Sequence, residues 1–442
     1  MTLPPKRLRR LPPGGAAGGP AEPDPRRLLS GAHAQLSGGN RLRLLTGGDE
    51  LFPAMRAAIE RAQHEVWLAT YIFHHDAAAL AMADVLAAAA ERGVQVRVVV
   101  DGFGSRAALP TLRAHWLASR VALAVFRPLD RWYAWFQPGQ MRRLHQKLCV
   151  VDSEVAFVGG INIIDDRVDL HHGSGDAPRL DFAVELRGPL VAHVEQTARA
   201  MWSRAAFGHD WREELRALAR SAEPIARVRA LLRRMRIMPR GEGEPRTHEP
   251  APVRAAFVVR DNLRQRRAIE HSYIDAFRAA RTHIDLASPY FYPGLTFRRT
   301  LRDAARRGVQ VRVLLQGKID YRIAGLAASV LYDELLAYGV RIFEYQPAFL
   351  HAKLARTDGE WCTIGSSNID PLSLLLNLEA NLVVCDAGFA AQVGAAFDQA
   401  LAVSHEVIAP PLPAGWSAVL RRGFVAWAAH WYLRMAGVMS RY

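Results

Sequence analysis

The stretch HQKLCVVDSEVAFVGGIN, residues 145–162, decides the fold, because residues 351–368, HAKLARTDGEWCTIGSSN, repeat its pattern. Each copy contains His-x-Lys, then four residues, then Asp, and places Gly and Asn at matching later offsets. One such short motif can arise by chance on a surface strand. Two copies in similar hydrophobic frames predict two half-sites that meet at a pseudo-two-fold axis in one shared active site.

The two copies supply equivalent residues, which are His145, Lys147, Asp152, Gly159 and Asn162 in the first and His351, Lys353, Asp358, Gly365 and Asn368 in the second. Residues two apart in a strand share a face, so each histidine points the same way as its own lysine. With two imidazoles, one can attack and the other can transfer a proton. The pattern therefore favours phosphoryl transfer without a metal, and we expect neither a metal site nor a cofactor.

The motif aspartates fall where each strand must turn. Asp358-Gly359 is a strong hairpin-turn pair, and Asp152-Ser153 occupies the equivalent place. We therefore interpret both aspartates, although they belong to the catalytic motif, as turn residues that support the site rather than carry protons. The returning strands bring small residues and then an asparagine beside the His-Lys face. Small residues there would let a phosphate approach the backbone closely.

The duplication extends well past the motifs. Residues 83–102 resemble residues 299–317, and both predict an amphipathic helix, a cap at Gly93 or Gly308, and a buried strand. Another helix and strand lie upstream of each, in residues 54–73 and 274–291. The spacing between the repeats is nearly constant along the chain. This predicts two homologous α/β domains, each a mixed β-sheet flanked by helices.

Composition shifts divide the chain into five parts. Residues 1–40 form a basic arm rich in Pro and Gly that we expect to be disordered. The two homologous domains occupy residues 41–215 and 253–408, and residues 216–252, rich in Arg, Glu and Pro, form a linker. Residues 409–442 form an amphipathic aromatic and basic segment.

The formal net charge of +14 predicts an anionic partner, either nucleic acid or a membrane surface. A genome that favours Arg and Ala is the alternative source of part of this charge. The three cysteines, Cys149, Cys362 and Cys385, have no metal-ligand spacing, and we expect free thiols, with Cys149 and Cys362 buried in core strands. No apolar run is long enough to span a bilayer and no signal peptide is evident, so a soluble or peripheral protein is expected.

Two aromatic and basic segments fit a membrane interface. In the C-terminal segment, apolar residues recur at steps of three or four with basic neighbours, as an interfacial helix requires. The loop before the first motif, which contains Trp132, Tyr133, Trp135 and Phe136, could dip into the lipid. The alternatives are a helix that packs on the catalytic core and a loop that packs over the active site.

Two other histidine clusters lack the spacing of a functional site. His74-His75-Asp76 follows a predicted strand, but adjacent strand residues face opposite sides and no third ligand has supporting spacing. His171-His172 lies in a stretch rich in Gly and Asp and is expected in an exposed loop. We therefore discount a metal site at either place.

The paired motifs resemble those of the phospholipase D superfamily and, within it, the bacterial cardiolipin synthases, most closely their B subgroup. The likeness runs from Arg41 to about Val407 and includes residues 141–162, 258–262, 290–311 and 343–381. The resemblance implies a covalent phosphohistidine, with His145 as the nucleophile and His351 as the acid and base. It also implies a carboxylate behind each histidine, and Asp181 and Glu379 match those positions.

The resemblance further implies that Lys147, Lys353, Asn162 and Asn368 hold the non-bridging phosphate oxygens. The implied reaction joins the phosphatidyl group of one phosphatidylglycerol, or of phosphatidylethanolamine, to the glycerol of another phosphatidylglycerol. The implied partners are phospholipids and an anionic membrane surface, with no nucleic acid. The implied location is peripheral, on the cytoplasmic face of the bacterial inner membrane.

Three other functions compete with this interpretation. A nuclease could use the same motif pair, although small nucleases of the superfamily usually carry one motif and dimerise. A hydrolytic phospholipase D would differ only in whether water reaches the phosphohistidine. A non-catalytic basic membrane-binding protein is disfavoured, because a degenerate relative would be expected to lose one motif.

Overall fold

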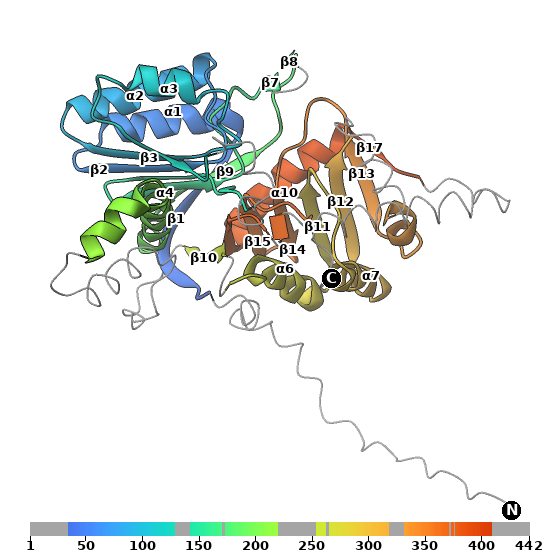
Figure 1. Ribbon diagram of the computed structural model, residues 1–442. Helices are drawn as coiled ribbons and strands as arrows, with labels where there is room; N and C mark the ends of the chain where they lie inside the picture. The colour runs from blue at the N-terminus through green and yellow to red at the C-terminus, as the bar shows by residue number, and fades with distance from the viewer. Residues whose placement is uncertain are drawn as a thin grey trace, which may run out of the picture.

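The computed structural model in Figure 1 describes residues 34–128, 142–169, 173–219, 253–261, 265–317, 331–370, 373–374 and 376–408. Several predictions concern residues outside these ranges: the N-terminal arm up to residue 33, the aromatic loop with Trp132, Tyr133, Trp135 and Phe136, the His171-His172 pair, the linker after residue 219, and the segment 409–442. These stay predictions.

The first half of the chain alternates strands and helices as predicted. Its elements are β1 (Ser37–Thr46), α1 (Gly47–Glu60), β2 (Glu65–Thr70), α2 (Ala77–Glu91), β3 (Gln95–Asp101), α3 (Leu109–His115), β4 (Ala122–Phe126), β5 (Leu148–Val151), β6 (Val155–Gly159), β7 (Val168–Asp169), β8 (Gly173–Ser174), β9 (Phe182–Arg187) and α4 (Val191–Ala219).

The second half repeats this order. Its elements are β10 (Val253–Arg260), α6 (Ala268–Ala279), β11 (His283–Ser288), α7 (Leu295–Arg306), β12 (Gln310–Gln316), β13 (Arg341–Tyr345), β14 (Leu354–Thr357), β15 (Trp361–Gly365), β16 (Glu379–Cys385), α10 (Ala387–Ala402) and β17 (Ser404–Glu406).

Local sequence explains where the repeated helices begin and end. Asp76 caps α2 by accepting a 2.8 Å hydrogen bond from the backbone N–H of Ala79. Gly93 and Gly308 follow α2 and α7 with φ of +94° and +91°, a left-handed conformation that glycine adopts without steric cost. The predicted glycine caps are therefore confirmed.

Two predicted boundaries fall inside regular elements. The arm was expected to run to residue 40, but β1 already begins at Ser37, because Ser37 and Asn40 pair with β10. The side chain of Asn40 accepts a 3.0 Å hydrogen bond from the N–H of Leu190, so this end of the strand is held in place. The linker was expected to begin at residue 216, but α4 continues to Ala219.

The strands form one mixed sheet rather than two separate sheets. The strand order among the described residues is β17-β13-β12-β11-β14-β15-β16-β10-β1-β9-β6-β5-β2-β3-β4. In each half three neighbouring strands are parallel, β2-β3-β4 and β11-β12-β13, and the inner strands are antiparallel. Apart from β17 at one edge, the order is symmetric about the antiparallel pair β1–β10. The duplication therefore becomes a pseudo-two-fold fold with a continuous sheet.

Helices cover both faces of the sheet, as Figure 1 shows for α1, α2 and α3 above β2 and β3 and for α4 below them. One large core cluster lies beneath α4 and α10 and includes residues from both halves, such as Met201 and Phe397. A second cluster lies beneath α6 and α7, and a third beneath α1 and α2. Cys149 and Cys362 are buried free thiols in the strands, as predicted.

Two equivalent hairpins carry the motifs to the middle of the sheet. β5 pairs with β6, and β14 pairs with β15, each antiparallel. Their turns place Asp152 and Ser153 at φ of +51° and +58°, and Asp358 and Gly359 at +50° and +86°. Both central residues are thus left-handed, which matches the right-handed twist of the flanking strands. The predicted turns are confirmed.

Candidate active site

The first histidine lies in the segment that leads into β5. The N–H of His145 donates a 3.0 Å hydrogen bond to the carbonyl of Leu378, and the N–H of Leu378 donates a 2.8 Å bond to the carbonyl of Arg143. These bonds align the chain before His145 with the chain before β16. Glu379, the first residue of β16, then lies 3.0 Å from Nδ1 of His145.

The second histidine repeats this arrangement with the halves exchanged. The N–H of His351 donates a 2.8 Å bond to the carbonyl of Leu180, and the N–H of Leu180 donates a 2.9 Å bond to the carbonyl of Phe349. Oδ2 of Asp181 then lies 2.5 Å from Nδ1 of His351. The family resemblance implied both carboxylates, and the structure adds that each one contacts the histidine of the other half.

This crossed pairing leaves one nitrogen of each ring for chemistry. Because Nδ1 faces a carboxylate, it carries the hydrogen, and Nε2 is the nitrogen that can attack or transfer a proton. His145 is 9% exposed and Glu379 is fully buried. Burial alone would raise the pKa of the Glu379 carboxyl, but the charges of His145 and Lys147 and a hydrogen bond from Ser366 hold it below its ordinary value. Glu379 is therefore anionic at neutral pH.

Two buried lysines accompany the histidines. The Lys147 ammonium donates a 2.7 Å hydrogen bond to the backbone carbonyl of His145, and the Lys353 ammonium bonds the carbonyl of His351 in the same way. Burial lowers the pKa of Lys147 to about 7 and that of Lys353 to about 8. Lys353 also lies 4.0 Å from Oδ2 of Asp181. An anionic phosphate would stabilise both ammonium groups.

The two half-sites share one electrostatic environment. Burial lowers the pKa of His351 well below its ordinary value, and the charges of Lys147 and His145, from the other half, contribute to the shift. Burial likewise lowers the pKa of His145, and Lys353 contributes to it. Unscreened interactions of this kind require short separations. Together with the crossed histidine–carboxylate contacts, this coupling favours one site formed by both halves.

The motif asparagines are buried on either side of this site. Oδ1 of Asn162 accepts a 3.2 Å hydrogen bond from the N–H of Ile72, so its amide nitrogen is the group that remains for a phosphate oxygen. Asn368 is 7% exposed, and its Oδ1 has no hydrogen-bond partner among the residues that the structure describes. This oxygen accepts hydrogen bonds, so a donor such as a ligand hydroxyl would satisfy it, whereas a phosphate oxygen would bind the amide nitrogen of Asn368.

The motif aspartates lie in the hairpin turns, away from the histidine–carboxylate pairs. Asp152 accepts hydrogen bonds of 2.7–2.8 Å from the N–H groups of residues 63–65. Asp358 accepts bonds from the N–H groups of residues 281–283 and from the hydroxyl of Thr282. Both aspartates, which the motif groups with the catalytic residues, are therefore turn residues. Each one holds the backbone that enters a neighbouring strand, β2 or β11.

Glycine is required at Gly159 and Gly365 for a different reason from the one that the sequence suggested. A Cβ on Gly159 would lie 2.5 Å from Cα of Ala183, and one on Gly365 would lie 2.2 Å from Oδ1 of Asn381. Both contacts are with the neighbouring strand, β9 or β16. These glycines are required by close strand packing rather than by the approach of a phosphate.

Sequence reasoning missed three residues of the site. Ser366 donates a 2.5 Å hydrogen bond to Oε2 of Glu379, whereas its counterpart Gly160 has no side chain, and a Cβ there would lie 2.4 Å from Oδ1 of Asp181. The difference between the motifs, Gly-Gly against Gly-Ser, was the available indication. The Tyr71 ring packs against His145 at 4.9 Å, and Arg179 contributes to the low pKa of His351. Nothing in the spacing pointed to these two.

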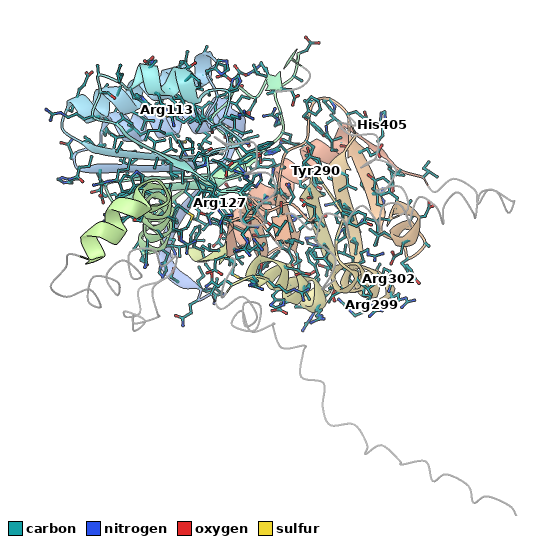
Figure 2. The ribbon with its side chains drawn as sticks, viewed as in Figure 1. Arg113, Arg127, Tyr290, Arg299, Arg302 and His405 are labelled. Carbon is teal, nitrogen blue, oxygen red and sulfur yellow. The ribbon has the colours of Figure 1, made fainter. Side chains whose placement is uncertain are left out.

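Aromatic and basic side chains reach the surface of both halves. Figure 2 labels Arg127 in the first half and Tyr290 in the second. Tyr290 is 40% exposed and Phe103 is 44% exposed, and the guanidinium of Arg143 lies 5.7 Å from the Phe103 ring. No group of three or more potential metal ligands occurs within the described ranges. In the same part of the chain no helix combines the length and hydropathy of a bilayer span.

A duplicated α/β fold with two His-x-Lys segments in one site defines a phospholipase D-type protein. A family model described as "Cardiolipin synthase, PLD-like domain" matches residues 55–175 and 273–401, once in each half. The chain therefore belongs to this family of the phospholipase D superfamily, as its sequence suggested.

Individual relatives agree with this assignment. Over 361 residues the chain is 34% identical to cardiolipin synthase B of Escherichia coli K12, covering 79% of this chain and 78% of that protein. Over 355 residues it is 32% identical to cardiolipin synthase A of Pseudomonas putida, covering 80% and 67%. Among solved structures, the phosphatidylserine synthase of Haemophilus influenzae has the same fold, with a TM-score of 0.61, 14% identity, and coverage of 93% and 97%.

Proposed function

We propose that this protein is a cardiolipin synthase that transfers the phosphatidyl group of one phosphatidylglycerol to the glycerol of another, through a phosphohistidine. The observation that carries the proposal is the pair of crossed histidine–carboxylate contacts beside two buried lysines. Such a site can bind one phosphodiester, supply a nucleophile and an acid, and balance the charge of the phosphate. The names of the relatives in two cardiolipin synthase groups support the substrate class.

In the first step we assign the attack on phosphorus to Nε2 of His145. The bound phosphodiester anion favours a proton on Nε2 of His351, against the effect of burial in the empty site. The bond between Nε2 of His145 and phosphorus forms as the bond from phosphorus to the glycerol oxygen breaks, and that proton moves from His351 to the oxygen. Glu379, held anionic by His145 and Lys147 and by the hydrogen bond from Ser366, stabilises the positive charge that develops on the His145 ring. The phosphatidyl group is then attached to the protein and free glycerol leaves.

In the second step the terminal hydroxyl of another phosphatidylglycerol attacks the same phosphorus. His351 removes the hydroxyl proton, the new P–O bond forms, and the bond to His145 breaks, which returns both histidines to their first state. Lys147 and Lys353, with the amides of Asn162 and Asn368, are the groups that hold the non-bridging oxygens, where negative charge increases in the transition state.

The setting of the reaction is a membrane surface. Both substrates are lipids, the net charge of +14 favours anionic headgroups, and the exposed rings of Phe103 and Tyr290 suit the interface. We propose peripheral attachment to the cytoplasmic face of the bacterial inner membrane, with phosphatidylethanolamine as an alternative donor. The predicted C-terminal aromatic segment would contribute to this attachment.

The direct test incubates the purified protein with phosphatidylglycerol vesicles and identifies the products by lipid mass spectrometry. Cardiolipin plus glycerol is the expected result. Phosphatidic acid plus glycerol would identify a hydrolase instead, and unchanged lipid would reopen the nuclease alternative. His145→Ala and His351→Ala should each abolish product formation. The control is His405→Ala, which should leave product formation unchanged, because His405, labelled in Figure 2, is exposed on the edge strand β17.

A further inference from the structure

A small polar cavity lies beside the second histidine. Its volume is about 70 Å³, and its walls come from the segment between β6 and β9, in the first half, and from the turn before His351, in the second. The charged residues of the lining are Asp166, Arg167, Asp169, Asp176 and Arg179, and Phe349 also lines the cavity. Figure 1 shows the β7–β8 hairpin of this segment projecting between the two halves.

Two residues that line this cavity are close in the chain to His351 and to its carboxylate partner. Phe349 precedes His351 by two residues, and Arg179 precedes Asp181, the partner of His351, by two residues. The backbone bond between Leu180 and Phe349 holds the two segments side by side. The cavity therefore lies two residues along the chain from His351 and from Asp181, on the two paired segments that carry them.

The chemistry of the lining suits a small polyol. Nη2 of Arg179 donates a 3.0 Å hydrogen bond to the carbonyl of Val168 and lies 3.5 Å from Oδ2 of Asp169. Asp166 is 7% exposed and accepts a bond from the N–H of Gly48. Carboxylates accept hydrogen bonds from hydroxyls, and a guanidinium donates to hydroxyl oxygens. By the measure in which one water needs roughly 10–15 Å³, the cavity holds about five waters, close to the six heavy atoms of glycerol.

The same position beside the first histidine has different residues. The pseudo-two-fold replaces Phe349 by Arg143 and Arg179 by Asn377. Arg143 lies 3.5 Å from the buried carboxylate of Asp101 and donates to the carbonyl of Arg127. The lining described above is therefore a property of the His351 side, where the proposed mechanism protonates the leaving oxygen.

We propose that this cavity is the head-group subsite, which binds the glycerol that leaves and then the glycerol of the incoming phosphatidylglycerol. The inference rests on the proposed function and deepens it. Glycerol leaves neutral, because its oxygen takes the proton from His351 as the P–O bond breaks. The acceptor glycerol occupies the same cavity and returns a proton to His351 as its oxygen bonds to phosphorus. An anionic head group would meet the carboxylates of Asp169 and Asp176 and bind less well.

Gly175 allows the cavity to be filled without disturbing the backbone. It lines the cavity, its φ is not left-handed, and the atoms nearest to an added Cβ are the carbonyl oxygens of Arg167 and Ala177, at 3.8 and 3.9 Å. Gly175→Phe would therefore occupy the space of the head group. The matched control is Gly388→Phe, at the exposed start of α10, where an added Cβ lies 3.4 Å from Oδ1 of Asp386.

The experiment measures the alcohol released in the first turnover from two donor lipids. Phosphatidylglycerol places glycerol in the cavity, whereas the methyl group of phosphatidylmethanol is too short to fill it. Gly175→Phe should slow glycerol release at least about tenfold and leave methanol release within about twofold of the wild-type rate. Gly388→Phe should leave both rates unchanged.

The outcomes separate the subsite from the reaction itself. Equal slowing of both lipids by Gly175→Phe, or an unchanged rate for phosphatidylglycerol, would overturn the subsite while the proposed function stands. If the wild-type protein releases neither alcohol, the proposed function fails and the subsite fails with it. A second variant, Asp176→Asn, removes one charged acceptor without changing size. It should lower kcat/KM for phosphatidylglycerol and not for phosphatidylmethanol, with exposed Asp303→Asn on α7 as its control.

Discussion

The crossed contact between His145 and Glu379 predicts that Glu379→Gln nearly abolishes activity without unfolding the protein. Glutamine has the size of glutamate and can keep hydrogen bonds to the ring and to Ser366. It lacks the negative charge that lies 3.0 Å from Nδ1 of His145. The substitution therefore isolates the electrostatic contribution of the carboxylate from its packing.

The magnitude follows from the distance and the burial. Glu379 is fully buried, so solvent does not screen its charge. Two unit charges about 4 Å apart interact by about 4 kcal/mol at the effective dielectric constant of about 20 that suits such sites. This interaction reaches its full strength only when the ring becomes positive during attack. Its loss should slow phosphatidyl transfer by about 10³-fold, since each 1.4 kcal/mol changes a rate about tenfold.

The assay compares initial rates of cardiolipin formation for the wild type, Glu379→Gln and the control Glu360→Gln. Glu360 is exposed in the turn before β15, so its substitution should leave the rate unchanged. Circular dichroism melting curves check that Glu379→Gln stays folded. A folded Glu379→Gln protein with more than about a tenth of the wild-type rate would refute the assignment of a charge-stabilising role to this carboxylate.

Three further predictions concern pH, the turns and the C-terminal segment. In a pH series, kcat/KM should rise through about pH 6, as Asp181 ionises, and fall above about pH 7 to 8, as Lys147 and Lys353 lose their protons. A profile that lacks either change would contradict the roles assigned to these residues. Asp358→Ala should lower the free energy of unfolding in urea by about 2 kcal/mol, because backbone N–H groups lose their acceptor. A large loss of kcat in the folded variant would instead show that Asp358 takes part in the reaction. Deletion after Pro413 should weaken sedimentation with anionic vesicles, and unchanged binding would argue against an interfacial helix.

The fold was accessible from local patterns that repeat. Two helices end at Gly93 and Gly308, and one hairpin turns at Asp358-Gly359. These features depend on the backbone conformations that single residue types allow, so they can be predicted from the residue types alone. The histidines, lysines and asparagines of the site could be predicted because the same motif occurs in both halves of the chain. The role of Gly159 could not be predicted, because its reason is the backbone of Ala183 on a neighbouring strand.

The sequence by itself predicted the duplicated α/β halves and the paired histidines and lysines, and the family resemblance added the two carboxylates. Only the tertiary structure decided that the carboxylates are exchanged, with Glu379 at His145 across 234 residues and Asp181 at His351 across 170. It also decided that β1 and β10 join the halves in one sheet. Periodicity and spacing report on neighbours along the chain, whereas these contacts arise from strand pairing between distant segments, and the pKa shifts of the buried groups arise from the loss of water that this pairing causes.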